Sequence, residues 1–204
     1  MTIPELEQRL SDPQFLNPEH GDLFYNVFIY QYPADQEYTI REQIQLLRDN
    51  LRRPTTQVEP IMINLYEQYM AYLDQKQFLK NPSMLRYLLD KEETDPNEAT
   101  KVHNIVQRNA ETPQFIEYLH QYIDNTIKSQ KNKLRTPYIF IYGVGSMYPY
   151  FRVNQFLTCY ERFNETSKYK IIVFYPGKQD GNTFRLFGFL PDSHTYKANL
   201  LLND

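Results

Sequence analysis

The sequence LFYNVFIYQYPADQEYTIREQIQLLRDNL, residues 23–51, contains the pattern that decides the fold. Its first part, residues 23–33, is an almost continuous run of aromatic and β-branched residues that ends at a proline. Such a run is typical of a strand buried on both faces. After a short loop, Thr39 and Glu42 have the spacing of a capping box, and apolar residues then recur at helical intervals. The stretch therefore predicts a strand, a loop and a helix capped by Thr39.

The same alternation continues toward the C-terminus. Residues 58–66 (VEPIMINLY) predict a second strand, which a helical pattern follows. Residues 137–146 (PYIFIYGVGS) predict a third strand that closes in glycines, and residues 152–160 predict the helix after it. Residues 170–177 (KIIVFYPG) predict a fourth strand, with 183–190 as its hairpin partner or an edge strand. The pattern indicates an α/β fold with a mostly parallel central sheet flanked by helices.

Capping residues mark the other helices. Thr2 and Glu5 have the spacing of a capping box, so a short helix is expected at the N-terminus. In the middle of the chain, capping residues stand before prolines and predict helices near 83–90, 97–109 and 113–130. The apolar stripe of the last of these helices is typical of core packing.

The composition indicates one globular domain. The chain of 204 residues has 41% hydrophobic and 23% charged residues, which excludes a fibrous or disordered protein. We expect residues 1–204 to form a single α/β domain, in which 81–112 is a candidate helical insertion. No apolar run reaches the ~20 residues of a membrane span, and the N-terminus lacks a signal peptide. A soluble cytoplasmic protein with no membrane contact is therefore expected.

The predicted fold resembles a nucleotide-binding core without the phosphate-loop residues. A phosphate-binding loop needs a glycine, four further residues and Gly-Lys-Ser/Thr between a strand and a helix, and the sequence has no such motif. Gly143 and Gly145, followed by Ser146, form a short Gly-x-Gly at the end of a predicted strand. This is a weak indication of anion binding, and a purely structural turn is the alternative.

Residues that could perform catalysis form no recognisable set. Cys159 is the only cysteine, which excludes an internal disulfide and a multi-cysteine metal site. Its position in a largely apolar helical segment indicates a structural residue. His103 and His120 lie in polar helical sequence, where surface residues are common. We therefore expect a protein without enzymatic activity, metal or cofactor.

Charge is distributed unevenly along the chain. Residues 1–100 contain 9 basic and 17 acidic side chains, whereas residues 101–204 contain 13 basic and 8 acidic ones. The basic half could meet an acidic partner or a phosphate backbone. Lys131, Lys133 and Arg135 are the candidate nucleic-acid contacts, and ordinary solvated surface charge is the alternative.

An aromatic segment follows the glycine turn. Tyr148, Tyr150, Phe151 and Arg152 lie at the expected mouth of the sheet, and Tyr and Arg are common among residues that contribute most of the binding energy in interfaces. Together with Arg185 of the last hairpin, they form a candidate protein interface. The alternative is that the rings only pack on neighbouring loops.

The C-terminal half has a recognisable family pattern. IFIYGVGSMYPYFRVNQFL (139–157) and IIVFYPGKQDGNTFRLFGFL (171–190) resemble BrxB, a small family of undefined molecular role encoded in BREX bacteriophage-defence clusters. The residues that carry the resemblance are Tyr142-Gly143-Val144-Gly145-Ser146, Pro149, Arg152, Phe174-Tyr175-Pro176-Gly177, Asp180-Gly181 and Arg185-Leu186-Phe187-Gly188. The resemblance implies a non-enzymatic component that works beside a methyltransferase, an ATPase and PglZ, which has an alkaline-phosphatase-like domain. It implies no catalytic residues.

These observations leave three hypotheses for function. The first is an assembly or adaptor subunit that binds another BREX protein, with PglZ as the first candidate and the methyltransferase as a further one. The second is a DNA- or RNA-binding accessory subunit of the same system, which rests on the basic C-terminal half. The third is a cryptic nucleotide-binding or hydrolytic protein that uses Gly143 to Ser146. The formation of homo-oligomers stays open.

Overall fold

Parallel strands form the centre of the sheet in the computed structural model, which describes residues 1–16, 27–163, 169–180, 183–191 and 199–200. Across these residues the strand order is β2-β3-β4-β1-β7, and each neighbouring pair is parallel. The strands are β1 (Val27–Tyr32), β2 (Val58–Asn64), β3 (Thr136–Tyr142), β4 (Lys170–Asp180) and β7 (Asn199–Leu200). The distal part of β4 pairs antiparallel with β5 (Thr183–Leu186), which pairs antiparallel with β6 (Leu190–Pro191), so the sheet is mixed.

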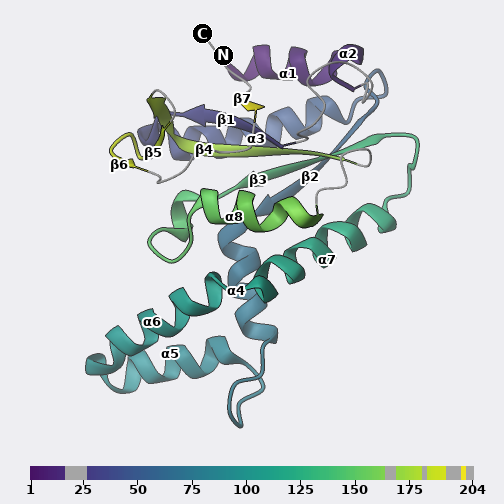
Figure 1. Cartoon of the computed structure of the whole chain (residues 1–204). Coiled ribbons are helices and arrows are strands. Elements are labelled where there is room, and N and C mark those ends of the chain that lie inside the picture. The colour runs from purple at the N-terminus through teal and green to yellow at the C-terminus, as the bar shows by residue number, and fades with distance from the viewer. Residues whose placement is uncertain (17–26, 164–168, 181–182, 192–198, 201–204) are drawn as a thin grey trace.

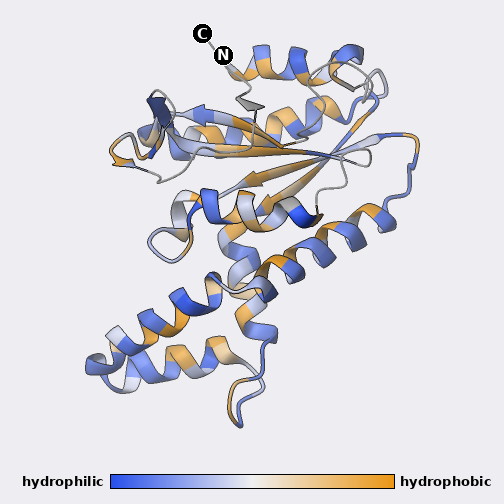
Figure 2. Cartoon of the chain, in the orientation of Figure 1, coloured by the Kyte–Doolittle hydropathy of each residue, from blue (hydrophilic) through white to orange (hydrophobic). Residues whose placement is uncertain are grey.

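Helices cover both faces of the sheet, as Figure 1 shows. Residues 170–177 of β4 are buried without interruption, because neither face of the strand meets water. Ile171, Val173 and Tyr175 belong to the core on one face, whereas Ile172 and Phe174 belong to the core on the other. In Figure 2 the strands are accordingly hydrophobic along much of their length, whereas the helices alternate between hydrophilic and hydrophobic residues. The expected α/β architecture with a mostly parallel centre is confirmed.

One face of the sheet is covered by α1 (Ile3–Ser11) and α3 (Glu37–Leu51), with α2 (Pro13–Leu16) after α1. The capping box at Thr2 is confirmed: its hydroxyl accepts a hydrogen bond from the Glu5 amide, and the Glu5 carboxylate accepts one from the Thr2 amide. The predicted cap at Thr39 is wrong. The short 3-10 helix η1 (Ala34–Gln36) leads straight into α3, so Thr39 lies inside its first turn.

The opposite face is covered by α4 (Leu65–Gln75), α7 (Pro113–Ser129) and α8 (Val153–Tyr160). In the apolar stripe of α7, Phe115, Leu119 and Ile123 are buried, as predicted, whereas Tyr122 of the same predicted stripe is exposed. Between β3 and α8 the chain forms the 3-10 helix η3 (Gly145–Met147), and η4 (Glu161–Phe163) follows α8.

A helical pair extends from α4 and α7 on the side away from the sheet (Figure 1). It consists of α5 (Met84–Thr94), the 3-10 helix η2 (Pro96–Glu98) and α6 (Ala99–Ala110), which lie within the candidate insertion 81–112. The cap of α5 is Ser83, whose hydroxyl accepts a hydrogen bond from the Arg86 amide at 3.1 Å. The sequence instead predicts a cap at Asn81, which stands before Pro82; Asn81 lies before the helix in a short bridge with Phe78. Among the described helices, none is long and apolar enough to cross a bilayer.

Candidate functional site

The carboxyl ends of the parallel strands meet along one edge of the sheet, which we call the carboxyl edge. Tyr32 of β1 pairs with Pro176 of β4, and Asn64 of β2 pairs with Tyr142 of β3, so these four residues mark it. Ligands of open α/β sheets bind at this edge, because loops and helix starts converge there. The residues around it therefore form the candidate site.

Gly143 stands at this edge because no other residue fits. Its φ is +72°, a left-handed conformation that costs a residue with a Cβ about 1–2 kcal/mol. A Cβ on Gly143 would also lie 2.4 Å from Oδ1 of Asn64. That oxygen is already used, since it accepts hydrogen bonds from the amides of Tyr66 and Glu67 at 3.2 and 3.4 Å and so caps α4.

At Gly145 the constraint is space rather than backbone conformation. A Cβ there would lie 2.9 Å from Cε1 of Phe187 and 3.1 Å from Cγ of Pro176, so the missing side chain makes room for the Phe187 ring. Phe187 itself has a φ of +57°, and its amide donates to the Pro176 carbonyl at 2.7 Å. The Gly-x-Gly is thus explained by packing against Asn64 and Phe187.

Ser146 is exposed and belongs to a polar network that crosses the carboxyl edge. Nη2 of Arg41 lies 3.4 Å from the Ser146 hydroxyl, and Nε of Arg41 pairs with Glu37 at 2.9 Å. The buried Tyr32 hydroxyl donates to the same carboxylate. Burial, with the hydrogen bond to Glu37, raises the pKa of Tyr32 above its ordinary value. The network holds α3 against the loop after β3.

Four side chains beside this turn form a cluster that we call the aromatic corner: Tyr148, Arg152, Phe187 and Phe189. The rings of Tyr148 and Phe187 meet edge to face at 6.1 Å, and those of Phe187 and Phe189 lie 6.4 Å apart. The Arg152 guanidinium lies 5.6 Å from the Tyr148 ring centroid, and its Nη1 donates to the Pro191 carbonyl at 2.8 Å. Phe189 is 66% exposed, so the corner presents an aromatic surface to solvent.

The remaining residues of the candidate protein interface lie apart from the aromatic corner. Phe151 is buried and contacts Phe115 edge to face at 5.8 Å, so it belongs to the core rather than to an accessible surface. The ring of Tyr150 contacts that of His103 on α6 in a tilted arrangement, with 4.9 Å between the ring centroids. Arg185 on β5 pairs with Asp180 across the hairpin at 2.8 Å.

The candidate anion contacts do not form one site. Gly143, Gly145 and Ser146 follow β3, whereas Lys131, Lys133 and Arg135 precede it. The seven residues of β3 separate these two groups by roughly 20 Å at about 3.3 Å per residue. The basic group therefore lies at the amino edge of the sheet, away from the glycine turn.

Residues with catalytic potential are separated in the structure. Within the described residues, no three His, Cys, Asp or Glu side chains lie close enough to hold a metal ion. Cys159 is partly buried on α8 and has a free thiol. His120 stacks on Phe163 at 4.5 Å, and its Nδ1 lies 3.5 Å from the Tyr160 hydroxyl. The arrangement at the carboxyl edge is suited to binding through aromatic and guanidinium groups.

Sequence reasoning missed Phe187 and Phe189 as members of the site. The signal was present as two phenylalanines on either side of a glycine in a tight turn, where apolar rings cannot all be buried. Gly188 has a φ of +85°, and the Gly188 amide donates to the Arg185 carbonyl at 3.0 Å.

Comparison with known proteins relates this chain to one family. The family model described as BREX protein BrxB matches residues 61–201, which include the whole aromatic corner. A BREX protein BrxB from Bacillus cereus (strain H3081.97) is 24% identical over 204 residues, which cover 98% of this chain and 96% of that protein. No solved structure matches the chain. Because the family model spans more than half of its length, the chain belongs to the BrxB family of BREX phage-defence proteins.

Proposed function

We propose that this protein is a non-enzymatic adaptor subunit of a BREX system and that it binds another BREX protein, PglZ first of all, through the aromatic corner. The observation that carries the proposal is an exposed Phe189 beside Tyr148, Phe187 and Arg152. Aromatic and arginine side chains are enriched in protein interfaces, where they contribute much of the binding energy.

The corner is also rigid, which lowers the entropy lost on binding. Phe187 is held by the hydrogen bond from its amide to the Pro176 carbonyl and by packing of its ring beside Gly145. Arg152 is held by its hydrogen bond to the Pro191 carbonyl. Two segments about 40 residues apart in sequence are thus held together before a partner arrives. Loops positioned by a rigid sheet are common places for recognition.

The test is co-purification of tagged protein with PglZ from the same BREX cluster, followed by titration calorimetry of the pair. Phe189→Asp places a charge in the centre of the proposed contact, and it leaves the core untouched because the ring is exposed. We expect binding at least tenfold weaker, which corresponds to about 1.4 kcal/mol.

The matched control is Leu89→Asp, which introduces the same charge at a side chain 56% exposed on α5. It should bind PglZ like the unmodified protein. If PglZ is not retained above a tag-only control, or if Phe189→Asp binds normally, the proposal is wrong. A loss with Leu89→Asp alone would assign the contact to the α5–α6 pair.

A further inference from the structure

The amino edge of the sheet brings together basic side chains from two distant segments. Arg52 and Arg53 follow α3 in the net acidic first half of the chain, and Lys131, Lys133 and Arg135 precede β3 in the basic second half. We call these five residues the basic edge. The sequence singles out only the second segment, because the two arginines lie about 80 residues earlier.

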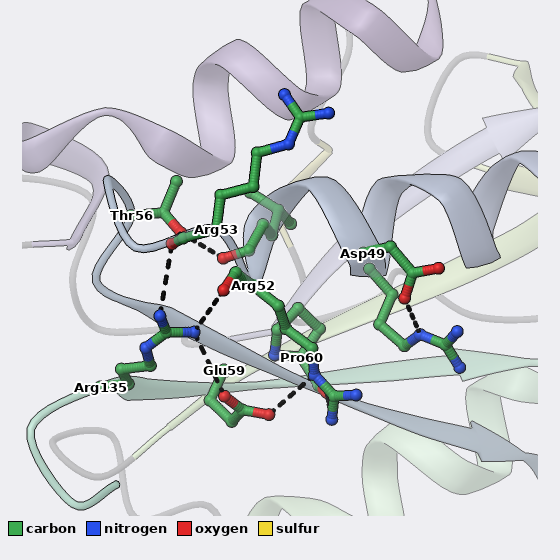
Figure 3. Close-up of polar contacts among 9 residues, drawn as sticks. Asp49, Arg52, Arg53, Thr56, Glu59, Pro60 and Arg135 are labelled. Atoms are coloured by element: carbon green, nitrogen blue, oxygen red, sulfur yellow. Dashed lines mark hydrogen bonds and ion pairs between the residues drawn. The ribbon is translucent and has the colours of Figure 1, made fainter.

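Arg135 joins the two segments, as Figure 3 shows. Its Nη1 donates to the Arg52 carbonyl at 2.9 Å, and its Nη2 donates to the Arg53 carbonyl at 3.3 Å. The side chain of Arg135 is only 17% exposed, and it lies 3.5 Å from Oε2 of Glu59 on β2. Arg135 is therefore a structural residue that fixes the loop 131–135 against the end of α3, and it is not an accessible phosphate contact.

Glu59 on β2 compensates part of this group of cations. Glu59 pairs with both Arg135 and Arg52, the latter at 2.8 Å, so its charge is shared between two arginines. Arg53 is exposed and donates to the neutral Asn50 side chain at 2.6 Å. In Figure 3 its guanidinium points away from Glu59. Two further carboxylates lie close by: Asp49 pairs with Arg48 and interacts electrostatically with Arg52, and Glu7 accepts a hydrogen bond from Asn50. The five cations of the basic edge, together with Arg48, outnumber these three carboxylates and leave a net positive surface.

Lys131 and Lys133 extend this surface. Both are exposed, and neither has a hydrogen bond or ion pair in the described part of the chain. Asn132 between them accepts the Leu134 amide at 3.1 Å, which fixes the turn that presents the two lysines. Three cations, Arg53, Lys131 and Lys133, are therefore directed to solvent from one rigid edge.

We propose that the basic edge binds the phosphate backbone of double-stranded DNA without reading its sequence. Lysine and arginine neutralise backbone phosphates and release counterions. Residues 48–59 and 130–136 contain no aromatic side chain on which an unpaired base could stack, which favours duplex over single-stranded nucleic acid. This surface is opposite the aromatic corner across the sheet, so DNA and a protein partner can be held together.

The test is fluorescence polarisation with a labelled 20-base-pair duplex of mixed sequence, measured over a series of salt concentrations. Three phosphate contacts predict a slope of about −2.7 for log K against log salt, or a loss of about 40-fold between 50 and 200 mM salt. Lys131→Glu/Lys133→Glu should weaken binding at least tenfold at the lower salt concentration and leave PglZ binding unchanged.

The matched control is Lys80→Glu/Lys91→Glu, which changes the net charge equally at two exposed lysines remote from the basic edge. It should lose much less affinity. Equal loss in the two double variants, a slope near zero, or no loss in Lys131→Glu/Lys133→Glu would each overturn the proposal. Tighter binding to single-stranded DNA of the same length would overturn the assignment to duplex. Urea denaturation checks that both variants fold normally.

Discussion

The contact between Gly143 and Asn64 makes a sharp prediction for stability. Gly143→Ala forces an alanine into a φ of +72° and places its Cβ 2.4 Å from Oδ1 of Asn64. The backbone cost of about 1–2 kcal/mol is partly offset by the lower entropy of the unfolded chain, which leaves about 1 kcal/mol. Displacing the Asn64 side chain also removes the cap of α4, which is typically worth about 1 kcal/mol. We expect a total loss of about 2 kcal/mol.

Gly188→Ala is the matched comparison. Gly188 has a similar φ of +85°, but an added Cβ would meet nothing within 4 Å. This variant should lose only the backbone contribution of about 1 kcal/mol. The difference of about 1 kcal/mol between the two variants therefore isolates the contact with Asn64.

Urea denaturation of both variants measures this difference. With a slope of about 2 kcal/mol per molar urea, the Gly143→Ala midpoint should lie about 0.5 M below that of Gly188→Ala. In an Asn64→Ala background the contact is gone, so Gly143→Ala should then cost about 1 kcal/mol, a coupling that a double-mutant cycle reports. Equal midpoints for the two glycine variants, or no coupling to Asn64, would refute the reasoning.

Two buried polar groups give further predictions. The Tyr138 hydroxyl is buried without a hydrogen-bond partner in the described structure, so Tyr138→Phe should raise the free energy of unfolding in urea by about 1 kcal/mol; a loss would contradict this. Lys170 is 7% exposed, over the rings of Phe15 and Phe28 at 4.4 and 5.5 Å, and burial lowers its pKa. Lys170→Met should therefore stabilise by about 1 kcal/mol at pH 7. The native protein binds the Lys170 proton less tightly than the unfolded chain does, so the stability of the unmodified protein rises with pH between the lowered pKa and 10.5. The stabilisation by Lys170→Met should therefore be smaller at pH 10 than at pH 7. Equal stabilisation at the two pH values would contradict this prediction.

The strands could be predicted from the sequence because each is a continuous apolar run that helices cover on both faces. β4 shows why: its buried residues 170–177 coincide with the predicted KIIVFYPG. The strand order could not be predicted in this way. β1 lies between β4 and β7, which follow it in sequence by more than 130 residues, and the choice of neighbour depends on long-range packing rather than on local pattern.

Local signals failed where a tertiary contact decided the outcome. Thr39 and Glu42 have capping-box spacing, but α3 begins at Glu37, where Tyr32 and Arg41 both bind the carboxylate. A helix that begins at Glu37 gains these two contacts, whereas the capping-box motif of Thr39 and Glu42 does not include them. At Thr2 both reciprocal hydrogen bonds of the capping box form, so the local motif and the structure agree.

Side chains of the same type had different roles in the candidate sites. Phe151 and Phe189 are both aromatic residues near the same turn, but Phe151 is 2% exposed and Phe189 is 66% exposed. Arg135 and Lys133 are two positions apart, but Arg135 binds backbone carbonyls and Lys133 faces solvent. The sequence pattern singled out these segments, and only the direction of each side chain in the structure separates core from surface.

The glycines after β3 explain why this edge differs from a phosphate-binding loop. In a phosphate-binding loop, glycines let the backbone approach the phosphate directly. Here the space beside Gly143 is taken by the Asn64 side chain, and the space beside Gly145 is taken by the Phe187 ring. Protein atoms thus occupy the places that glycines would leave open for a ligand, and the ring that fills one of them supports Tyr148 and Phe189 at the surface. The carboxyl edge, where open α/β sheets commonly bind ligands, therefore supports an aromatic surface in this protein, and under the proposed function that surface meets a protein partner.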